Sequence, residues 1–485
     1  MQKKLEKQRA FFRSGRTIPL AFRKKALKRL GRAIRQHEKE IYAALREDLN
    51  KSKTETFMCE VGMTLAELSY MLKHLEGWAK KKYVRSPLAQ FSATSFTVKE
   101  PYGVALIMSP WNYPFMLTME PLIGAIAAGN CAVVKPSAYA PATSAVIRRI
   151  LRACFPEEYI FVVEGGRAEN QALLDQRFDY IFFTGGVTVG KEVMAKAAKH
   201  LTPVTLELGG KSPCVVDRTA KLELAAKRIA FGKLLNCGQT CVAPDYILVE
   251  RSVKDEFLVY LKKWIVRMYG ADATENDAYV KMINQKHFDR VTGLIDPEKV
   301  IFGGGRNERT MQIQPTILDD VTAEDAVMQE EIFGPIFPIL SVDSMAEAEE
   351  FICKREKPLA LYLFTQNKAL AERFLRYVPF GGGCINDTII HLATSKMGFG
   401  GVGGSGMGSY HGKKSFETFS HEKSIVNKHT WMDLPVRYAP YHRIQRLLLR
   451  LFLRRINQII HRYPEDLCQL HHGRHIGNAV ATLPF

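Results

Sequence analysis

Long apolar runs and clustered cysteines are both missing from this sequence of 485 residues. No uninterrupted apolar stretch approaches the ~20 residues that a membrane-spanning helix needs. The first residues, MQKKLEKQRAFF, are charged and lack the apolar core of a secretory signal. The nine cysteines are odd in number and scattered, unlike those of small disulfide-bonded secreted domains. We therefore expect reduced thiols and a cytoplasmic protein.

Signatures of nucleic-acid binding are also missing, although the net charge is +18. The chain has no zinc-finger spacing, no aromatic-glycine RNA-binding box and no basic region followed by heptads. The basic residues between 24 and 35 punctuate an apolar helical pattern, which is typical of a solvated helix face. We expect no nucleic-acid partner. With 46% hydrophobic and 24% charged residues, the chain resembles a soluble globular protein of two or three domains.

Apolar periodicity predicts helices up to about residue 82 and then a change to alternating strands and helices. Such alternation is typical of parallel βαβ units in an open α/β sheet, whose ligands bind at the carboxyl ends of the strands. A second series of the same kind begins near residue 213. The segment SATSFTVKEPYG alternates like an exposed strand and could form an arm. The strands of the first series are VALIM, CAVVK, YIFVV, DYIFFTG and PVTLEL, and those of the second include PCVV, YILVE and LALYLFT.

The stretch FTGGVTVGKE has the G-x-x-x-x-G-K spacing of a nucleotide triphosphate loop, but Glu192 follows the lysine. That loop requires Ser or Thr there to hold magnesium, so a kinase or ATPase is not expected. A helix beginning near Thr188 would still offer free N–H groups to a pyrophosphate, and Gly185 and Gly186 would allow a close approach. An ordinary strand-to-helix turn explains the same glycines.

Cys237 and Cys241 lie four apart in NCGQTC and raise the question of a metal pair, a redox pair or a nucleophile. A structural metal site needs a second ligand pair, and dithiol oxidoreductases use C-x-x-C, so neither is expected. Cys237 falls in the last turn of a predicted helix, which fits an inert buried thiol. Cys241 lies beyond Gly238 on a loop that could face a cleft.

A cysteine nucleophile needs an acid or base and a site for a developing oxyanion. Asn112 follows the first strand of the first series, and Glu207 lies at the end of its fifth. Both positions belong to the carboxyl edge of the predicted sheet. Each residue also has a purely structural explanation: Asn112 could be a turn residue, and Glu207 could pair with a nearby Lys or Arg.

Seven stretches occur in the order and with the spacing typical of the aldehyde dehydrogenase superfamily, and together they resemble it. The resemblance covers about residue 10 to about residue 430, and the glycine-rich end is most similar to the class 3 branch. The stretches are SPWNYPF, VVKPS, FTGG, TLELGGKSP, NCGQTCVAPDY, QEEIFGP and GGVGGSGMGSYHGKKSFETFSH.

The resemblance implies NAD(P)-dependent oxidation of an aldehyde to the carboxylic acid through a cysteine thiohemiacetal and a thioester. Cys241 matches the family nucleophile, Glu207 the base that activates water, and Asn112, with the N–H of Cys241, the oxyanion site. No metal is implied. The matching cofactor contacts are Trp111, Lys135, Gly185, Gly186, Glu331 and Phe333. Among them, Lys135 matches the ligand to the adenosine ribose, and Glu331 and Phe333 match the contacts to the nicotinamide end.

Two departures from the family pattern concern the cofactor. The family often has Glu after KPS, where the carboxylate binds both ribose hydroxyls, and here the residue is Ala138. Its loss weakens one contact to NAD and removes a charge that would repel a 2′-phosphate. We therefore expect NADP to be tolerated, and a preference for NADP over NAD stays open. The serine common in the phosphate turn is Gly186.

The resemblance also implies a fold and a division into domains. We expect an α/β fold with a Rossmann-type dinucleotide-binding domain (1–83 and 104–207), an α/β catalytic domain (208–404) and a small β bridging arm (84–103 and 405–430). The arm implies a homodimer. A cysteine hydrolase, a CoA-acylating reductase and a non-catalytic scaffold are the rival functions. Cys241, Glu207 and Asn112 together disfavour the scaffold, and a water-activating Glu207 disfavours the reductase.

The last segment, 435–485, contains a basic amphipathic helix. This pattern fits a helix bound at an anionic membrane surface, docked on a partner, or packed on its own protein. Peripheral attachment to the inner face of the membrane would suit medium- and long-chain or other lipophilic aldehydes. The apolar face comprises Ile444, Leu448, Leu451, Phe452, Ile456 and Ile459, and the basic face Arg446, Arg450 and Arg454.

Overall fold

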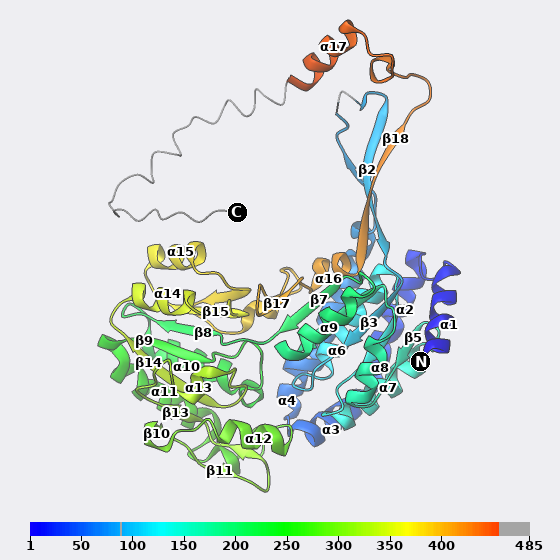
Figure 1. Cartoon of the computed structure of the whole chain (residues 1–485). Coiled ribbons are helices and arrows are strands. Elements are labelled where there is room, and N and C mark those ends of the chain that lie inside the picture. The colour runs from blue at the N-terminus through cyan, green and yellow to red at the C-terminus, as the bar shows by residue number, and fades with distance from the viewer. Residues whose placement is uncertain (88–89, 455–485) are drawn as a thin grey trace, which may run out of the picture. The chain divides into compact units, whose positions relative to one another are not determined.

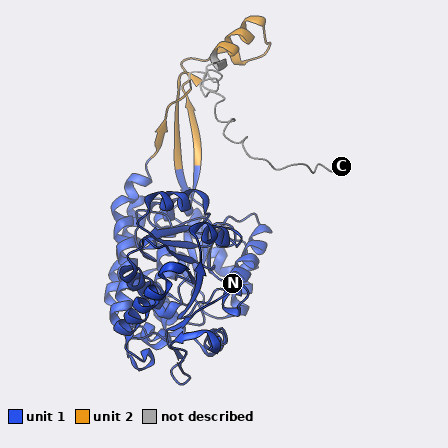
Figure 2. Ribbon diagram, turned by 90° about the vertical axis from the view of Figure 1, so that its left-hand side faces the viewer, with its two compact units in different colours: residues 1–80, 99–422 blue, residues 81–98, 423–485 orange. Residues whose placement is uncertain are grey.

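The computed structural model describes residues 1–87 and 90–454 (Figure 1). It divides into two compact units, 1–80 with 99–422 and 81–98 with 423–485, coloured separately in Figure 2. Each unit is described by itself below.

Helices make up the N-terminal part of the first unit. The apolar positions of α2 recur every three or four residues, and Leu27, Leu30 and Ile34 are fully buried as a result. This helix packs on α5 and on later helices of the same unit. The helices are α1 (Gln2–Arg13), α2 (Leu20–Gln36), α3 (Glu38–Leu49), α4 (Lys53–Thr56) and α5 (Gly62–Trp78), with a π-helical turn at Phe57–Val61.

A six-stranded sheet in the order β17-β7-β6-β3-β4-β5 follows. All neighbours are parallel except β17, which joins β7 antiparallel from far along the chain. The strands are runs of buried apolar residues, as expected for a sheet covered on both faces. They are β3 (Val104–Met108), β4 (Cys131–Lys135), β5 (Ile160–Val162), β6 (Tyr180–Gly185), β7 (Val204–Leu208) and β17 (Gly406–Met407), with α6 (Met116–Ala128), α7 (Pro141–Cys154), α8 (Arg167–Leu174), α9 (Val187–Ala198) and α16 (Gly412–Thr418).

A seven-stranded sheet in the order β10-β13-β14-β9-β8-β15-β16 forms the other half of this unit (Figure 1). Its strands are parallel except for β10. The strands are β8 (Pro213–Val216), β9 (Tyr246–Glu250), β10 (Val300–Phe302), β13 (Thr316–Leu318), β14 (Ile336–Val342), β15 (Ala360–Phe364) and β16 (Gly382–Ile385), beside a β11 (Arg306–Asn307) and β12 (Gln312–Ile313) ribbon. The helices are α10 (Leu222–Leu234), α11 (Lys254–Tyr269), α12 (Gln285–Thr292), α13 (Ala326–Gln329), α14 (Met345–Cys353) and α15 (Lys368–Tyr377).

The predicted α/β fold with two sheets is confirmed, and the sheets change over between β7 and β8. The division at residue 208 into a dinucleotide-binding and a catalytic domain stays a prediction. The predicted arm of 84–103 and 405–430 also stays a prediction. Residues 405–422 belong to the first unit, because β17 pairs with β7 and α16 packs on α6.

The second unit contains β1 (Lys82–Val84), most of β2 (Ala93–Pro101), most of β18 (Ser420–Lys428) and α17 (Arg443–Arg454). β1 pairs antiparallel with β2, which lies where a strand was predicted, although its residues are half-buried or buried and not exposed. On α17, Ile444, Leu448 and Leu451 are exposed. The side chains of Phe452 and Arg454, and Ile456 and Ile459, lie outside the described part. Among the described residues, no helix is long and apolar enough to cross a membrane.

Candidate active site

The parallel order of the first sheet brings the predicted site residues to one edge. In the register of neighbouring strands, Met108 pairs with Lys135 and Thr184 with Glu207, so β3, β4, β6 and β7 end at the same level. The ends of β3, β6 and β7 and the loops after them line a cavity of about 420 Å³, together with residues from the second half of this unit. We call this the cofactor cavity. Its lining includes Trp111, Asn112, Gly185, Gly186, Glu207, Cys241, His287, Arg290, Glu331 and Phe333.

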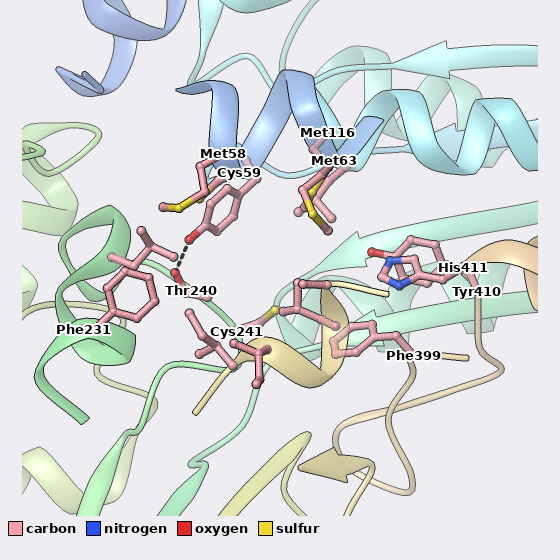
Figure 3. A pocket seen from close by; sticks show the side chains of 17 residues that line it. Met58, Cys59, Met63, Met116, Phe231, Thr240, Cys241, Phe399, Tyr410 and His411 are labelled. Atoms are coloured by element: carbon pink, nitrogen blue, oxygen red, sulfur yellow. Dashed lines mark hydrogen bonds between the residues drawn. The ribbon is translucent and has the colours of Figure 1, made fainter. Parts of the chain in front are cut away.

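A second cavity, of about 160 Å³, shares Leu117 and Cys241 with the first. Figure 3 shows the side chains that line it. We call it the apolar cavity, because aliphatic, aromatic and sulfur-containing side chains dominate its lining. Met58 and Met63 lie across it from Cys241 in Figure 3. The lining comprises Met58, Cys59, Met63, Tyr113, Met116, Leu117, Phe231, Leu235, Thr240, Cys241, Ile389, Ile390, Leu392, Ala393, Phe399, Tyr410 and His411.

A left-handed turn carries the chain from α10 to Cys241. Asn236, Cys237 and Gly238 have φ values of 53°, 54° and 73°. A Cβ at Gly238 would lie 2.2 Å from the carbonyl oxygen of Gly334, so only glycine fits there. The prediction that Cys237 lies in the last turn of α10 is therefore wrong. Apolar periodicity indicates where a helix runs, but it does not reveal three successive left-handed residues.

The two cysteines of this turn occupy different environments. Cys237 is fully buried, and its thiol contacts the hydroxyl of Tyr279 at 3.4 Å. Cys241 is partly exposed and lies on both cavities. Burial, followed by the nearby carboxyls of Glu331 and Glu207, raises the pKa of the Cys241 thiol.

Asn112 is buried where β3 gives way to α6. Its Nδ2 donates a hydrogen bond to the carbonyl of Gln239 at 3.0 Å, two residues before Cys241. The backbone carbonyl of Asn112 accepts a hydrogen bond from Asn236 Nδ2 at 2.9 Å. Asn112 is thus bonded directly to the loop that carries the thiol.

Glu207 is 3% exposed, and neither of its carboxylate oxygens has a hydrogen-bond partner among the described residues. Burial raises its pKa well above the usual value of a glutamic acid. A buried, unpaired carboxyl on a cavity wall keeps its proton to higher pH than an exposed one and can accept or donate a proton there.

The cofactor cavity has features that suit a dinucleotide. Helix α9 begins directly after Gly186, and a Cβ at Gly186 would meet nothing within 4 Å, so the helix N-terminus is accessible to a pyrophosphate. The carboxyl of Glu331 has one oxygen, Oε1, without a partner among the described residues, and burial raises its pKa to about 8. The rings of Phe333 and Trp111 pack edge to face at 5.3 Å. These groups fit NAD or NADP.

Lys135 is not among the residues that line the cofactor cavity. It is buried at the end of β4, and its Nζ donates to the carbonyl of Pro136 at 2.9 Å. Ala138, three residues on, is exposed. Contact between Lys135 and a ribose stays a prediction.

Comparison with known proteins decides the family. The pattern that defines the aldehyde dehydrogenase family matches residues 1–425. The chain belongs to this family. Accordingly, it is an enzyme that oxidises an aldehyde to a carboxylic acid with NAD or NADP.

Three similar relatives indicate which branch of the family this aldehyde dehydrogenase resembles. The 4,4′-diaponeurosporen-aldehyde dehydrogenase of Staphylococcus aureus is 48% identical over 91% of the chain and 96% of the relative. Aldehyde dehydrogenase family 3 member A2 of Rattus norvegicus is 46% identical over 88% of each. The dimeric NADP-preferring aldehyde dehydrogenase of Canis lupus familiaris is 46% identical over 90% and 97%. The class 3-like resemblance is confirmed.

Solved structures agree with the fold. The substrate-bound Staphylococcus aureus AldH superposes with a TM-score of 0.92 at 47% identity, covering 93% of this chain and 99% of that one. An indole-3-acetaldehyde dehydrogenase in complex with NAD+ has a TM-score of 0.81 at 26% identity, covering 88% of each.

The structure of this aldehyde dehydrogenase also adds residues that the sequence analysis did not select. His287 and Arg290 of α12 line the cofactor cavity. Lys51, Glu55 and Glu60 lie close behind Asn112 and the Cys241 loop. In a single sequence these three resemble the other charged residues of a helical region, so only their burial distinguishes them.

Proposed function

We propose that this aldehyde dehydrogenase oxidises medium- and long-chain aliphatic or other lipophilic aldehydes. The observation that carries this proposal is the apolar cavity that ends at Cys241. An apolar lining favours a hydrocarbon chain because burying apolar surface contributes about 25 cal/mol per Å². Three methionines of the lining, Met58, Met63 and Met116, can adjust to different chain shapes.

In the proposed reaction, the Cys241 thiol gives its proton to solvent water, and the thiolate sulfur attacks the aldehyde carbon. The oxyanion of the resulting thiohemiacetal accepts hydrogen bonds from the Asn112 amide and the backbone N–H of Cys241. NAD or NADP held in the cofactor cavity would supply the hydride acceptor, and the substrate carbon would lose its hydride at this stage. Cys241 then holds the acyl group as a thioester.

Glu207 releases the acid in this scheme. Its carboxylate accepts a proton from a water molecule as the water oxygen attacks the thioester carbon, and the Cys241 sulfur leaves. Trp111, Gly185, Gly186, Glu331 and Phe333 hold the cofactor, with Lys135 at the adenosine ribose. The absence of a carboxylate at Ala138 makes NADP acceptable beside NAD.

Growth of reduced-nicotinamide absorbance tests the proposal. Purified enzyme is assayed with decanal and with acetaldehyde, each with NAD and with NADP, beside Cys241→Ala. We expect decanal to have the higher kcat/KM, by about 10-fold or more, since several additional methylenes are buried at about 0.8 kcal/mol each. Equal kcat/KM for the two aldehydes would contradict the substrate class, and activity in Cys241→Ala would contradict the nucleophile.

We also propose that the enzyme is a homodimer assembled through the second unit. The canine relative is named dimeric, and Tyr83, Val84, Ile425 and Val426 on the strands of this unit are 38–65% exposed. Apolar side chains exposed together in this way suit a subunit interface. Light scattering after gel filtration should give twice the 54.8 kDa of one chain. A monomer at micromolar concentration would overturn this proposal.

For α17 we propose peripheral contact with the anionic inner face of the cytoplasmic membrane. Ile444, Leu447, Leu448 and Leu451 share one side of the helix and are 42–72% exposed, beside Arg446 and Arg450. An exposed apolar face with adjacent cations suits the boundary between lipid head groups and acyl chains. A lipophilic aldehyde partitions into the same layer.

A further inference from the structure

A buried ion pair lies behind Asn112 and has no part in the scheme above. Lys51 is 1% exposed, Glu60 is fully buried, and Lys51 Nζ lies 2.6 Å from Glu60 Oε1. Burying two charges costs several kcal/mol per ion, which only close pairing and additional hydrogen bonds offset. The other contacts of the two residues therefore indicate what the pair holds in place.

Lys51 contacts two consecutive residues beside the thiol. Its Nζ donates to the Asn112 carbonyl at 2.9 Å and lies 4.0 Å from the centroid of the Tyr113 ring. The Tyr113 hydroxyl in turn bonds the Thr240 hydroxyl at 2.7 Å, the dashed line in Figure 3. Thr240 precedes Cys241. The Lys51 ammonium thus contacts Asn112, which carries the proposed amide donor. Through the Tyr113 ring it is also connected to Thr240, the neighbour of Cys241.

Glu60 fixes the other end of the same segment. Its Oε2 accepts hydrogen bonds from the backbone N–H groups of Phe115 and Met116, both at 3.0 Å, where α6 begins. Residues 112–116 are therefore held at the carbonyl of Asn112 by a cation and at their last two amides by an anion. Hydrogen bonds to charged groups are about twice as strong as neutral ones.

We infer that Lys51, paired with Glu60, is the positioning residue for the oxyanion site. It holds the Asn112 backbone so that the side-chain amide reaches the substrate oxygen, and it places a positive charge behind the developing negative one. This inference rests on the proposed roles of Asn112 and Cys241. Lys51 and Glu60 touch neither substrate nor cofactor in it.

Lys51→Met, Glu60→Gln and the double variant test this inference. Lys51→Met alone leaves Glu60 buried without its cation and should lower the Tm. The double variant K51M/E60Q removes both charges at similar side-chain volume and should recover most of that Tm. Its kcat with decanal should nevertheless stay about 10- to 100-fold below wild type, because a misplaced group costs this much even in a folded site.

Alkylation of Cys241 by iodoacetamide separates positioning from a general structural effect. This substitution displaces iodide and forms no oxyanion, so the rate in the double variant should stay within about threefold of wild type. KM for decanal should change less than kcat. Lys254→Met is the matched control, because Lys254 also pairs with carboxylates, those of Asp319 and Asp320, and is not among the residues that line either cavity.

Three outcomes decide the inference. A wild-type kcat in the double variant would overturn it. An equal loss of kcat and of the Cys241 alkylation rate would also overturn it, because Lys51 would then act on the cysteine loop alone. If the double variant does not fold, Glu60→Gln is decisive by the same two readouts, with a loss of kcat of about 10-fold expected. A wild-type enzyme without aldehyde oxidation would instead contradict the proposed function.

Discussion

The carboxyl of Glu331 lies directly against the backbone of Gly209. A Cβ added at Gly209 would stand 1.9 Å from Glu331 Oε2, far inside contact distance. At Gly210 a Cβ would meet nothing closer than 3.7 Å. Gly209 therefore leaves room for the Glu331 carboxyl on the cofactor cavity, whereas Gly210 has space for a Cβ of its own.

This relationship predicts an effect on cofactor binding for one of two adjacent substitutions and none for the other. Gly209→Ala should displace the Glu331 carboxyl and raise KM for NAD(P) by about 10-fold, the equivalent of one lost hydrogen bond to a charged group. The Tm should hardly change, because the displaced atoms belong to the end of a flexible side chain. Gly210→Ala, the control, should leave KM and Tm as they are. Unchanged KM values in both variants would contradict the contact.

The two cysteines of the NCGQTC loop should differ fully in function. Cys241→Ala removes the proposed nucleophile and should lower kcat by about 10⁴-fold or more. Cys237→Ala removes a buried thiol that lines neither cavity, so it should cost about 1 kcal/mol of stability and leave kcat close to wild type. Initial rates and thermal unfolding measure both. Loss of activity in Cys237→Ala at unchanged Tm would argue against Cys241 as the sole reactive thiol.

Glu207 should set the pH dependence of thioester hydrolysis. Burial raises its pKa, and only the deprotonated form can accept a proton from water, so the rate should rise with pH until Glu207 is ionised. Glu207→Gln should lower the rate by about 10²- to 10⁴-fold and remove this acidic limb. Single-turnover acid release across pH measures it. If the variant shows the same pH profile as wild type, the rise of the rate with pH comes from a group other than Glu207.

The same carboxyl should affect stability in the opposite direction. The folded chain holds the Glu207 proton more tightly than the unfolded chain, so ionisation destabilises the fold as pH rises from the unfolded pKa through the folded one. Glu207→Gln cannot ionise. Its Tm should match wild type near about pH 4 and exceed it increasingly towards about pH 8. A constant difference in Tm across this range would show that Glu207 is not the titrating group.

A carboxylate restored at position 138 should change the cofactor preference. In Ala138→Glu the new charge would repel a 2′-phosphate and bind ribose hydroxyls, so the ratio of kcat/KM for NADP over NAD should fall by about 10-fold, or about 1.4 kcal/mol. Ala138→Gln matches the size without the charge and should change the ratio less. Equal ratios in both variants would place residue 138 away from the ribose.

Binding of the full chain to vesicles tests the proposed role of α17. Deletion after residue 435 should abolish co-sedimentation with phosphatidylglycerol vesicles, while decanal oxidation in detergent persists. Arg446→Ser with Arg450→Ser should weaken binding by about 10-fold or more, at about 1 kcal/mol for each arginine. Phosphatidylcholine vesicles are the uncharged control. A full-length protein that ignores both vesicle types would overturn the proposal.

Much of this molecule follows from its sequence. Unbroken apolar strands between amphipathic helices determine two parallel sheets, because only burial on both faces suits such strands. Parallel topology then brings the ends of β3 and β7 to one edge, which is why Asn112 and Glu207 could be grouped before any contact was known. The motif NCGQTC separates a loop cysteine from a buried one.

Only the tertiary structure decided what surrounds these residues. The left-handed turn at Asn236 and Cys237 has no periodic signal, since it depends on contacts with Gly334 and Glu55 from distant parts of the chain. Segment 405–422 joined the first unit through a two-residue strand too short to recognise. Lys51 and Glu60 read as ordinary helix-surface charges, and only the packing of α6 against the N-terminal helices buries them behind Asn112, because burial depends on neighbours that the local sequence does not contain.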